Sequence, residues 1–132
     1  MAQRDGTSLV LPNLVVSEDQ TSSTIAPQSI REVFYASCSD EDVTLGGMLL
    51  APEALAPAVT PIHITEERFG RVPRVYIECL QDKVIPVPFQ RQMHATLPCR
   101  AVVSLNTDHS PFFSAPQQLT ESLTVLAVLG AA

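Results

Sequence analysis

The residues of this chain best suited to chemistry are a carboxylate and an imidazole, each at the end of an apolar run. Asp82 follows the run 74–81, and His109 follows the run 101–107. An imidazole can take a proton from a hydroxyl group near neutral pH, and a carboxylate beside it fixes the ring tautomer and stabilises the imidazolium ion. Asp82 and His109 therefore predict the acid and the base of a nucleophile, acid and histidine triad.

The two runs must be strands of one sheet if they are to bring these side chains together. The segment between them has a helical pattern, which gives the order strand, helix, strand of a βαβ unit. Parallel strands joined in this way end at the same edge of the sheet, where open α/β sheets bind their ligands. Acid before histidine is also the chain order of α/β-hydrolases, in which a Gly-x-Ser-x-Gly turn comes first. No such turn occurs in the sequence, so the pattern lacks its nucleophile.

Two helices are expected to flank these strands. In the helix between them, three apolar residues should face the sheet: Phe89, Met93 and Leu97. Three polar residues of the same helix are expected to point outward: Gln90, Arg91 and Gln92. A last helix begins near Ser114-Ala115-Pro116 and should place three leucines inward: Leu119, Leu123 and Leu126. Since two parallel strands need covering and lateral pairing, this half of the chain is expected to be marginally stable or to associate.

The residues before position 70 predict smaller elements. Residues 9–26 alternate apolar and polar runs, as in a β-hairpin with a polar turn. Pro27 suits the first position of a short helix whose apolar face is Ile30, Val33 and Phe34. These segments predict a small unit that precedes the α/β half.

A second helix and a connector follow. The sequence Ser39-Asp40-Glu41-Asp42 resembles a capping box and predicts a helix that starts there. Its apolar positions would be Val43, Leu45, Met48 and Leu49. Prolines predict a connector over residues 51–61, and Thr65 is placed to cap one further turn that Gly70 ends.

Composition narrows the function classes. The chain has 132 residues, enough for one domain or part of a larger one, and 45% of them are hydrophobic. Its net charge is −6, so nucleic acid and anionic membranes would be repelled over most of the surface. Three widely spaced cysteines do not fit a disulfide framework: Cys38, Cys79 and Cys99 are expected to be reduced thiols, with Cys79 facing the sheet core. The sequence shows no signal-peptide pattern and no run long enough for a bilayer, so a soluble cytoplasmic protein is expected.

Three stretches resemble the methylesterase and hydroxynitrile lyase group of plant and bacterial α/β-hydrolases. Residues 71–86 resemble its acid-bearing strand, 107–116 its histidine loop and 34–50 its cap segment. The resemblance implies an α/β fold: the C-terminal part of an α/β-hydrolase, with two parallel strands and flanking helices, plus a small cap with a β-hairpin and helices. It implies a cap or lid over residues 1–70, a core segment over 71–132, and the absence of the nucleophile-bearing N-terminal half.

By the same resemblance, Asp82 is the triad acid and His109 the base of a carboxylic ester hydrolase. In the lyase branch a lysine directly follows the catalytic histidine, whereas this chain has Ser110 there, which favours ester hydrolysis. The substrate would be a small-molecule ester, provided that a serine-bearing segment completes the site. No cofactor and no metal are expected.

Several residues have a simpler interpretation. Asp82 could cap a turn or helix, and His109 could be an ordinary loop histidine. Asp108 is expected to accept hydrogen bonds within its loop. It is not expected to be the triad acid, because the side chains of adjacent residues diverge. Ser110 lacks the strained elbow and the oxyanion donors that activate a nucleophile. His94 is expected on the surface or in packing, as is His63, because neither has a ligand at metal-binding spacing.

One group of apolar residues has two interpretations. Core packing is the commoner interpretation, and the other is that they line a substrate pocket beneath the cap. The residues concerned are Phe34, Tyr35, Met48 and Leu49.

The function likewise has alternatives. One is a binding or interaction protein that keeps the hydrolase fold without catalysis. Another is a homo-oligomer that completes its sheet between copies, because an unpaired strand is a template for pairing.

Overall fold

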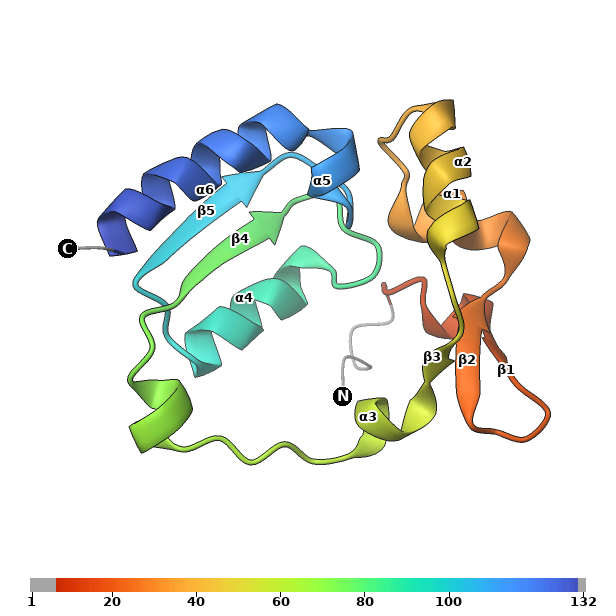
Figure 1. Cartoon of the computed structure of the whole chain (residues 1–132), viewed down its shortest axis with the longest axis horizontal. Helices are drawn as coiled ribbons and strands as arrows, with labels where there is room; N and C mark the ends of the chain where they lie inside the picture. Colours follow the sequence, from red (N-terminus) through yellow and green to blue (C-terminus); the bar gives the residue numbers. More distant parts are fainter. Residues whose placement is uncertain (1–6, 131–132) are drawn as a thin grey trace.

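The computed structural model describes residues 7–130, with side chains as far as residue 127. Its strands form two separate sheets, an antiparallel sheet of three strands in the first half of the chain and a parallel sheet of two strands in the second half. Two helices, α1 (Ile30–Phe34) and α2 (Asp40–Leu49), and the antiparallel sheet lie beyond the carboxyl ends of the two parallel strands (Figure 1). Within residues 7–130, no helix is long and apolar enough to cross a membrane.

The parallel sheet is the one that the βαβ pattern predicted. Strand β4, Val75–Cys79, pairs with β5, Ala101–Leu105, in a register that runs from Val75 opposite Ala101 to Cys79 opposite Leu105. Pairing continues past both strands, because the Leu80 N–H donates to the Leu105 carbonyl at 2.9 Å and the Gln81 N–H to the Thr107 carbonyl at 2.8 Å. The loops after β4 and β5 therefore start side by side.

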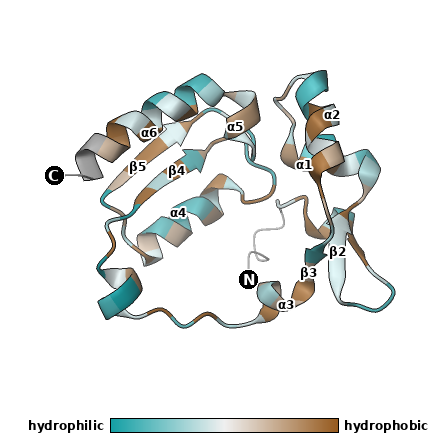
Figure 2. Ribbon diagram, in the orientation of Figure 1, coloured by the Kyte–Doolittle hydropathy of each residue, from teal (hydrophilic) through white to brown (hydrophobic). Residues whose placement is uncertain are grey.

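Helices α4, Val87–Thr96, and α6, Pro116–Gly130, flank the parallel sheet (Figure 1). Successive side chains of a strand point to alternate faces, so Glu78 and Val75, three positions apart, lie on opposite faces of the sheet. The helix that each of them contacts shows that α4 and α6 cover opposite faces. Glu78 of β4 contacts α4 through His94, whereas Val75 lines an apolar depression with Leu126 of α6. Figure 2 shows hydrophobic residues along both strands, as expected for a sheet covered on both sides.

The inward face of α4 differs from the expected one. Gln90, predicted to point outward, is 2% exposed and reaches the backbone of β4. Met93 and Leu97, predicted to pack inward, are both partly exposed. Within residues 7–130 β4 has no strand partner on its outer side, and its last residue offers backbone groups there that an apolar side chain cannot satisfy. On α6 the predicted inward face is partly right, since Leu126 is buried and Leu123 is half exposed.

The predicted hairpin is present. Strand β1, Leu14–Val16, pairs antiparallel with β2, Ser22–Ile25. Its turn is held by Asp19, whose Oδ1 accepts hydrogen bonds from the Ser17 hydroxyl and from both the backbone and the hydroxyl of Thr21. Sequence patterns missed a third strand, β3, Glu53–Ala54, which adds to β2 inside the expected connector. The short helix α3, Leu55–Val59, follows it.

The two predicted helices of the first half also form. A 3₁₀ turn at Pro27–Ser29 leads into α1, Ile30–Phe34, and α2 spans Asp40–Leu49 with Ser39 as its N-cap. The Ser39 hydroxyl accepts a hydrogen bond from the Asp42 backbone, as a capping residue should.

Helix α2 does not bury its apolar side. The buried residue of this helix is Gly46, which packs on the Tyr35 ring. Met48 is 80% exposed and Leu49 is 69% exposed. The expectation that these two residues pack in a core is therefore wrong for residues 7–130.

The remaining elements connect these units. A single π-helical turn, Glu66–Gly70, sits where one turn was predicted, and residues 60–65 before it are extended and exposed. A short helix, α5, Pro111–Ser114, follows the histidine loop and leads into α6. The loops that follow β4 and β5, which carry Asp82 and His109, therefore lie between the parallel sheet and α1 (Figure 1).

Candidate active site

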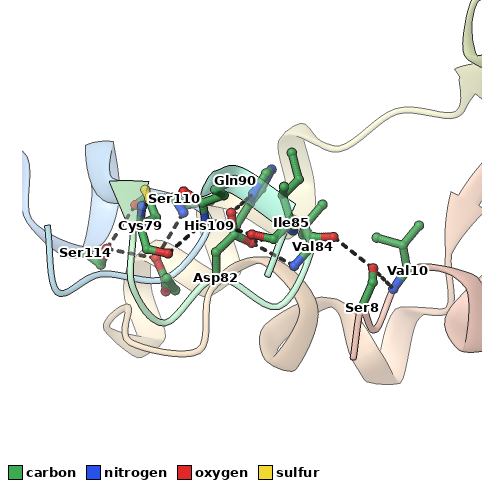
Figure 3. A network of polar contacts seen from close by, with 11 residues as sticks. Ser8, Val10, Cys79, Asp82, Val84, Ile85, Gln90, His109, Ser110 and Ser114 are labelled. Atoms are coloured by element: carbon green, nitrogen blue, oxygen red, sulfur yellow. Dashed lines mark hydrogen bonds and ion pairs between the residues drawn. The ribbon is translucent and has the colours of Figure 1, made fainter. Parts of the chain in front are cut away.

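Asp82 lies in the loop after β4 and is buried. Its Oδ1 accepts hydrogen bonds from the backbone N–H groups of Val84, at 2.7 Å, and Ile85, at 3.0 Å. Its Oδ2 is 3.0 Å from Nδ1 of His109 (Figure 3). One carboxylate oxygen thus holds the loop in shape, and the other faces the imidazole.

The acid loop is also held from the start of the chain. The Ser8 hydroxyl donates to the Val84 carbonyl at 2.8 Å, and the Leu9 N–H donates to the Lys83 carbonyl at 2.8 Å. Figure 3 shows this chain of contacts running from Ser8 through Val84 to Asp82 and His109. Residues far apart in sequence therefore position the same loop.

His109 lies in the loop after β5, and about a third of its side chain is exposed. Because an ionised carboxylate can only accept, Nδ1 must donate to Asp82, and Nε2 of the neutral ring is then left as the acceptor. The Phe34 ring lies against the imidazole, with centroids 5.9 Å apart and planes inclined by 43°. A fixed tautomer with an available Nε2 is the arrangement a general base needs.

A cavity of about 240 Å³ opens beside His109. Its apolar lining comes from both halves of the chain: Leu14, Ile25, Phe34, Leu50 and Val84. The polar residues Ser23, Thr24 and Glu53 also line the cavity. Of the four residues considered for a pocket, Phe34 lines this cavity, whereas Tyr35 is buried against Phe113 at 5.8 Å between ring centroids. Met48 and Leu49 lie outside it.

Asp108 holds the histidine loop from within, as the sequence predicted. It is 1% exposed, and its Oδ1 accepts hydrogen bonds from the Ser110 N–H and the Ser114 hydroxyl. Its Oδ2 accepts from the Ser37 N–H at 2.8 Å and from the Cys38 thiol at 3.4 Å. Asp108 therefore joins the histidine loop to the segment between α1 and α2.

The Cys38 thiol stays protonated in this arrangement. Burial raises the pKa of Cys38 to about 12, and the hydrogen bond to Asp108 with its negative charge adds to the rise. Burial also raises the pKa of the Cys79 thiol. Both cysteines are buried free thiols, and Cys79 ends β4 at the core as expected.

Ser110 is placed for structure and not for attack. It is 2% exposed, its N–H donates to Asp108, and its carbonyl accepts from the backbone of Phe113 and Ser114. A nucleophile must reach a substrate, so this burial agrees with the sequence argument against Ser110.

Sequence reasoning missed a second polar cluster, on the α4 face of the sheet. The buried Glu78 carboxylate contacts Arg91 and His94 of α4, each at 3.1 Å, and accepts from the Ser104 hydroxyl of β5 at 2.8 Å. The hydrogen bonds from His94, Arg91 and Ser104 lower the pKa of Glu78 to about 2. The signal was available, since Glu78 occupies a buried strand position that an apolar strand would give to an aliphatic residue.

The Glu78 cluster anchors α4 on the sheet. His94 thus has a packing role, as expected, and His63 is exposed on the connector. Among the described residues, no group of three His, Cys, Asp or Glu side chains could hold a metal ion.

Comparisons with known proteins point to esterases. No protein-family model matches the chain. Salicylic acid-binding protein 2 of Nicotiana tabacum is 36% identical over 120 residues, which are 89% of this chain and 46% of that protein. The pyrethroid hydrolase of Sphingobium wenxiniae is 37% identical over 101 residues, which are 76% of this chain and 36% of the hydrolase. The chain therefore spans less than half the length of these relatives.

Solved structures give the same result. Polyneuridine aldehyde esterase superposes with a TM-score of 0.75 at 27% identity, over 86% of this chain and 47% of the esterase. A pyrethroid hydrolase superposes with a TM-score of 0.77 at 29% identity, over 96% of this chain and 51% of the hydrolase. The described elements thus match about half of each larger structure.

Proposed function

Because the chain belongs to the α/β-hydrolase superfamily, in the group of the plant methylesterases and bacterial pyrethroid hydrolases, we propose that it carries the acid and base of a carboxylic ester hydrolase. Asp82 would be the acid and His109 the base. The observation that carries the proposal is the 3.0 Å contact between Nδ1 of His109 and Oδ2 of Asp82, beside a cavity that His109 lines. In this proposal residues 1–70 form the cap and residues 71–132 belong to the catalytic core.

The chemistry follows from the tautomer of His109. Nε2 would take the proton of a serine hydroxyl as its oxygen attacks the ester carbonyl, and Asp82 would stabilise the imidazolium that forms. His109 would then give the proton to the departing alkoxide, which leaves as the alcohol. Water, activated by the same nitrogen, would hydrolyse the acyl-serine and free the carboxylic acid.

The serine must come from elsewhere in this proposal. The 132 residues contain no Gly-x-Ser-x-Gly turn, and Ser110 is buried. We propose that a serine-bearing segment outside these residues completes the site and supplies the oxyanion donors. The substrate would be a small-molecule ester with an apolar group, because the cavity beside His109 is lined mainly by aliphatic and aromatic side chains. Ser110, where lyases of the family have lysine, supports hydrolysis over the lyase reaction.

Complementation tests this proposal. The chain would be co-expressed with the serine-bearing part of the Sphingobium pyrethroid hydrolase, which it matches over only 36% of that protein. Turnover of a p-nitrophenyl ester should then appear and be lost in a complex that carries His109→Ala. The chain alone should hydrolyse the ester no faster than the same chain with His109→Ala. Turnover of the complex that is unaffected by His109→Ala would contradict the proposal.

A second candidate function is binding or assembly without catalysis. The observation that favours it is the amount of apolar surface, since Val59 is 79% exposed and Ile62 is 84% exposed on the connector. In residues 7–130 the parallel sheet also has only two strands, so its outer edges have no strand partner. A homo-oligomer would cover such surfaces. Light scattering after size-exclusion chromatography tests assembly, because a monodisperse oligomer supports it, whereas a monomer contradicts assembly and leaves binding as the non-catalytic candidate.

A further inference from the structure

The buried side chain of Gln90 closes the loop that carries Asp82. Its Oε1 accepts a hydrogen bond from the Cys79 N–H at 3.0 Å. Its Nε2 donates to the Cys79 carbonyl at 2.9 Å and to the Ile85 carbonyl at 2.7 Å. Both amide protons and the amide oxygen are therefore used, as Figure 3 shows between Gln90 and β4.

These three hydrogen bonds reach both sides of Asp82. Cys79 is the last residue of β4, three residues before the acid, and Ile85 is three residues after it. Ile85 also donates its N–H to Oδ1 of Asp82. Gln90 thus holds the two ends of the loop at a fixed separation, and within the loop the backbone holds Oδ1. Oδ2 is then directed at His109.

Gln90 also takes the place of a neighbouring strand. The Leu80 N–H points to β5, so the backbone groups of Cys79 point to the opposite, outer edge of β4. The primary amide of Gln90 pairs with them as a peptide unit of another strand would. Without it, the Cys79 carbonyl would keep the Asp82 N–H as a donor at 3.2 Å, but the Cys79 N–H and the Ile85 carbonyl would lose the partners that Gln90 gives them. Unpaired backbone groups on both sides of the acid are unfavourable enough to reshape the loop.

We propose that Gln90 is a positioning residue of the ester hydrolase inferred above, and that it acts through Asp82. Its amide fixes the loop so that Asp82 meets Nδ1 of His109 and holds the tautomer in which Nε2 accepts. This inference rests on the proposed function for its catalytic meaning. Its structural content, an Asp82 to His109 contact that depends on Gln90, can be measured without turnover.

The test compares two identical changes on α4. Gln90→Met keeps a side chain of similar length and removes all three hydrogen bonds, whereas Gln92→Met makes the same change at an exposed position two residues later. One measurement is the hydrogen-exchange rate of the Val84 and Ile85 amides, which bind Asp82. The other is the proton resonance of His109 Nδ1–H, which is visible when it is held in a hydrogen bond.

Gln90→Met should speed exchange at both amides by about tenfold or more, since a hydrogen bond of this kind contributes about that factor. It should also remove the His109 Nδ1–H signal, while the exchange of β5 amides changes little. Gln92→Met should leave both signals as in the parent chain. A folded Gln90→Met chain with the His109 signal intact would overturn the proposal.

Gln90→Glu provides the second variant. It is isosteric and keeps the acceptor for the Cys79 N–H, but as a carboxylate it loses the donors to the Cys79 and Ile85 carbonyls. The proposal expects it to lose the His109 signal as well. If both Gln90 variants unfold while Gln92→Met folds, Gln90 is a general stability residue and the positioning role is wrong. One further outcome separates the two proposals. If the Gln90 variants lose the His109 Nδ1–H signal but the parent chain, completed by a serine-bearing segment, shows no turnover, the proposed function is wrong and the positioning role of Gln90 stands.

Discussion

The carboxylate of Asp108 accepts a hydrogen bond of 2.8 Å from the backbone N–H of Ser37, which lies 71 residues earlier in the chain. This contact ties the loop of the proposed base to the segment that leads from α1 to α2. Phe34, at the end of α1, contacts the His109 ring. The wall of the cavity and the proposed base are therefore positioned by one buried carboxylate.

The first prediction concerns this link. Asp108→Asn places an amide N–H opposite hydrogen-bond donors and removes the charge that strengthens them, so it should lower the free energy of unfolding by roughly 1.5–3 kcal/mol. Asp40→Asn is the control, because the exposed carboxylate of Asp40 pairs with the exposed Arg31, a type of contact that contributes about 0–1 kcal/mol. Urea unfolding measures both. Equal effects of the two substitutions would show that the Asp108 link is unimportant.

A second prediction follows from the lowered pKa of Glu78. Its pKa is about 2 in the folded chain against an ordinary value of 4.5, so it adds stability above pH 4.5 that is lost as the pH falls toward 2. Glu78→Gln should be less stable than the parent at pH 7, by on the order of 2–3 kcal/mol. The difference should shrink steadily between about pH 4.5 and 2. Unfolding curves with the same constant difference at pH 7 and pH 3 would refute this assignment.

Neighbouring glycines of α2 give a third prediction. A Cβ on Gly46 would lie 2.6 Å from Cζ of the buried Tyr35 ring, whereas a Cβ on Gly47 would meet nothing within 4 Å. Gly47→Ala should therefore stabilise the protein by roughly 0.5–1 kcal/mol through helix propensity alone. Gly46→Ala should lower the melting temperature, because the clash with Tyr35 outweighs the same gain. The packing of α2 on Tyr35 would be disproved if both substitutions raised the melting temperature.

Thiol reactivity supplies a fourth prediction. Cys38 is buried with a pKa raised to about 12, and burial also raises the pKa of Cys79, so neither presents a thiolate near pH 8. Cys99 is partly exposed. A thiol reagent should label Cys99 in the folded protein and the other two only after denaturation. Peptide mapping identifies the labelled positions, and Cys38 modified as fast as Cys99 would contradict the burial described for the Asp108 link.

Local patterns predicted the parts of the fold that depend on local rules. The strand, helix, strand order placed Asp82 and His109 at one edge of a parallel sheet, because connections of this kind have one common geometry. Ser39 could be predicted as a helix cap because capping is also a local rule, in which the hydroxyl accepts a hydrogen bond from a backbone N–H two or three residues ahead.

Three features escaped because they depend on distant partners. Periodicity assigned Gln90 to solvent, but the outer edge of β4 requires a polar group at that position. Strand β3 has two residues, too few for a recognisable alternation, and forms because β2 is there to pair with it. The apolar residues of α2 suggested a buried side, yet Gly46 makes the contact, because Tyr35 leaves no room for a side chain.

The coupling between Asp82 and His109 in catalysis tests the central claim most directly. In the complex completed by a serine-bearing segment, kcat/KM would be measured for the parent, Asp82→Asn, His109→Ala and the double variant. Residues that act as one unit are not additive, so the double variant should be no slower than His109→Ala alone. The account is contradicted if the losses of kcat/KM in the two single variants multiply in the double variant, or if Asp82→Asn leaves kcat/KM unchanged. Asp82 and His109, in contact at 3.0 Å, would then not be the acid and base of an ester hydrolase.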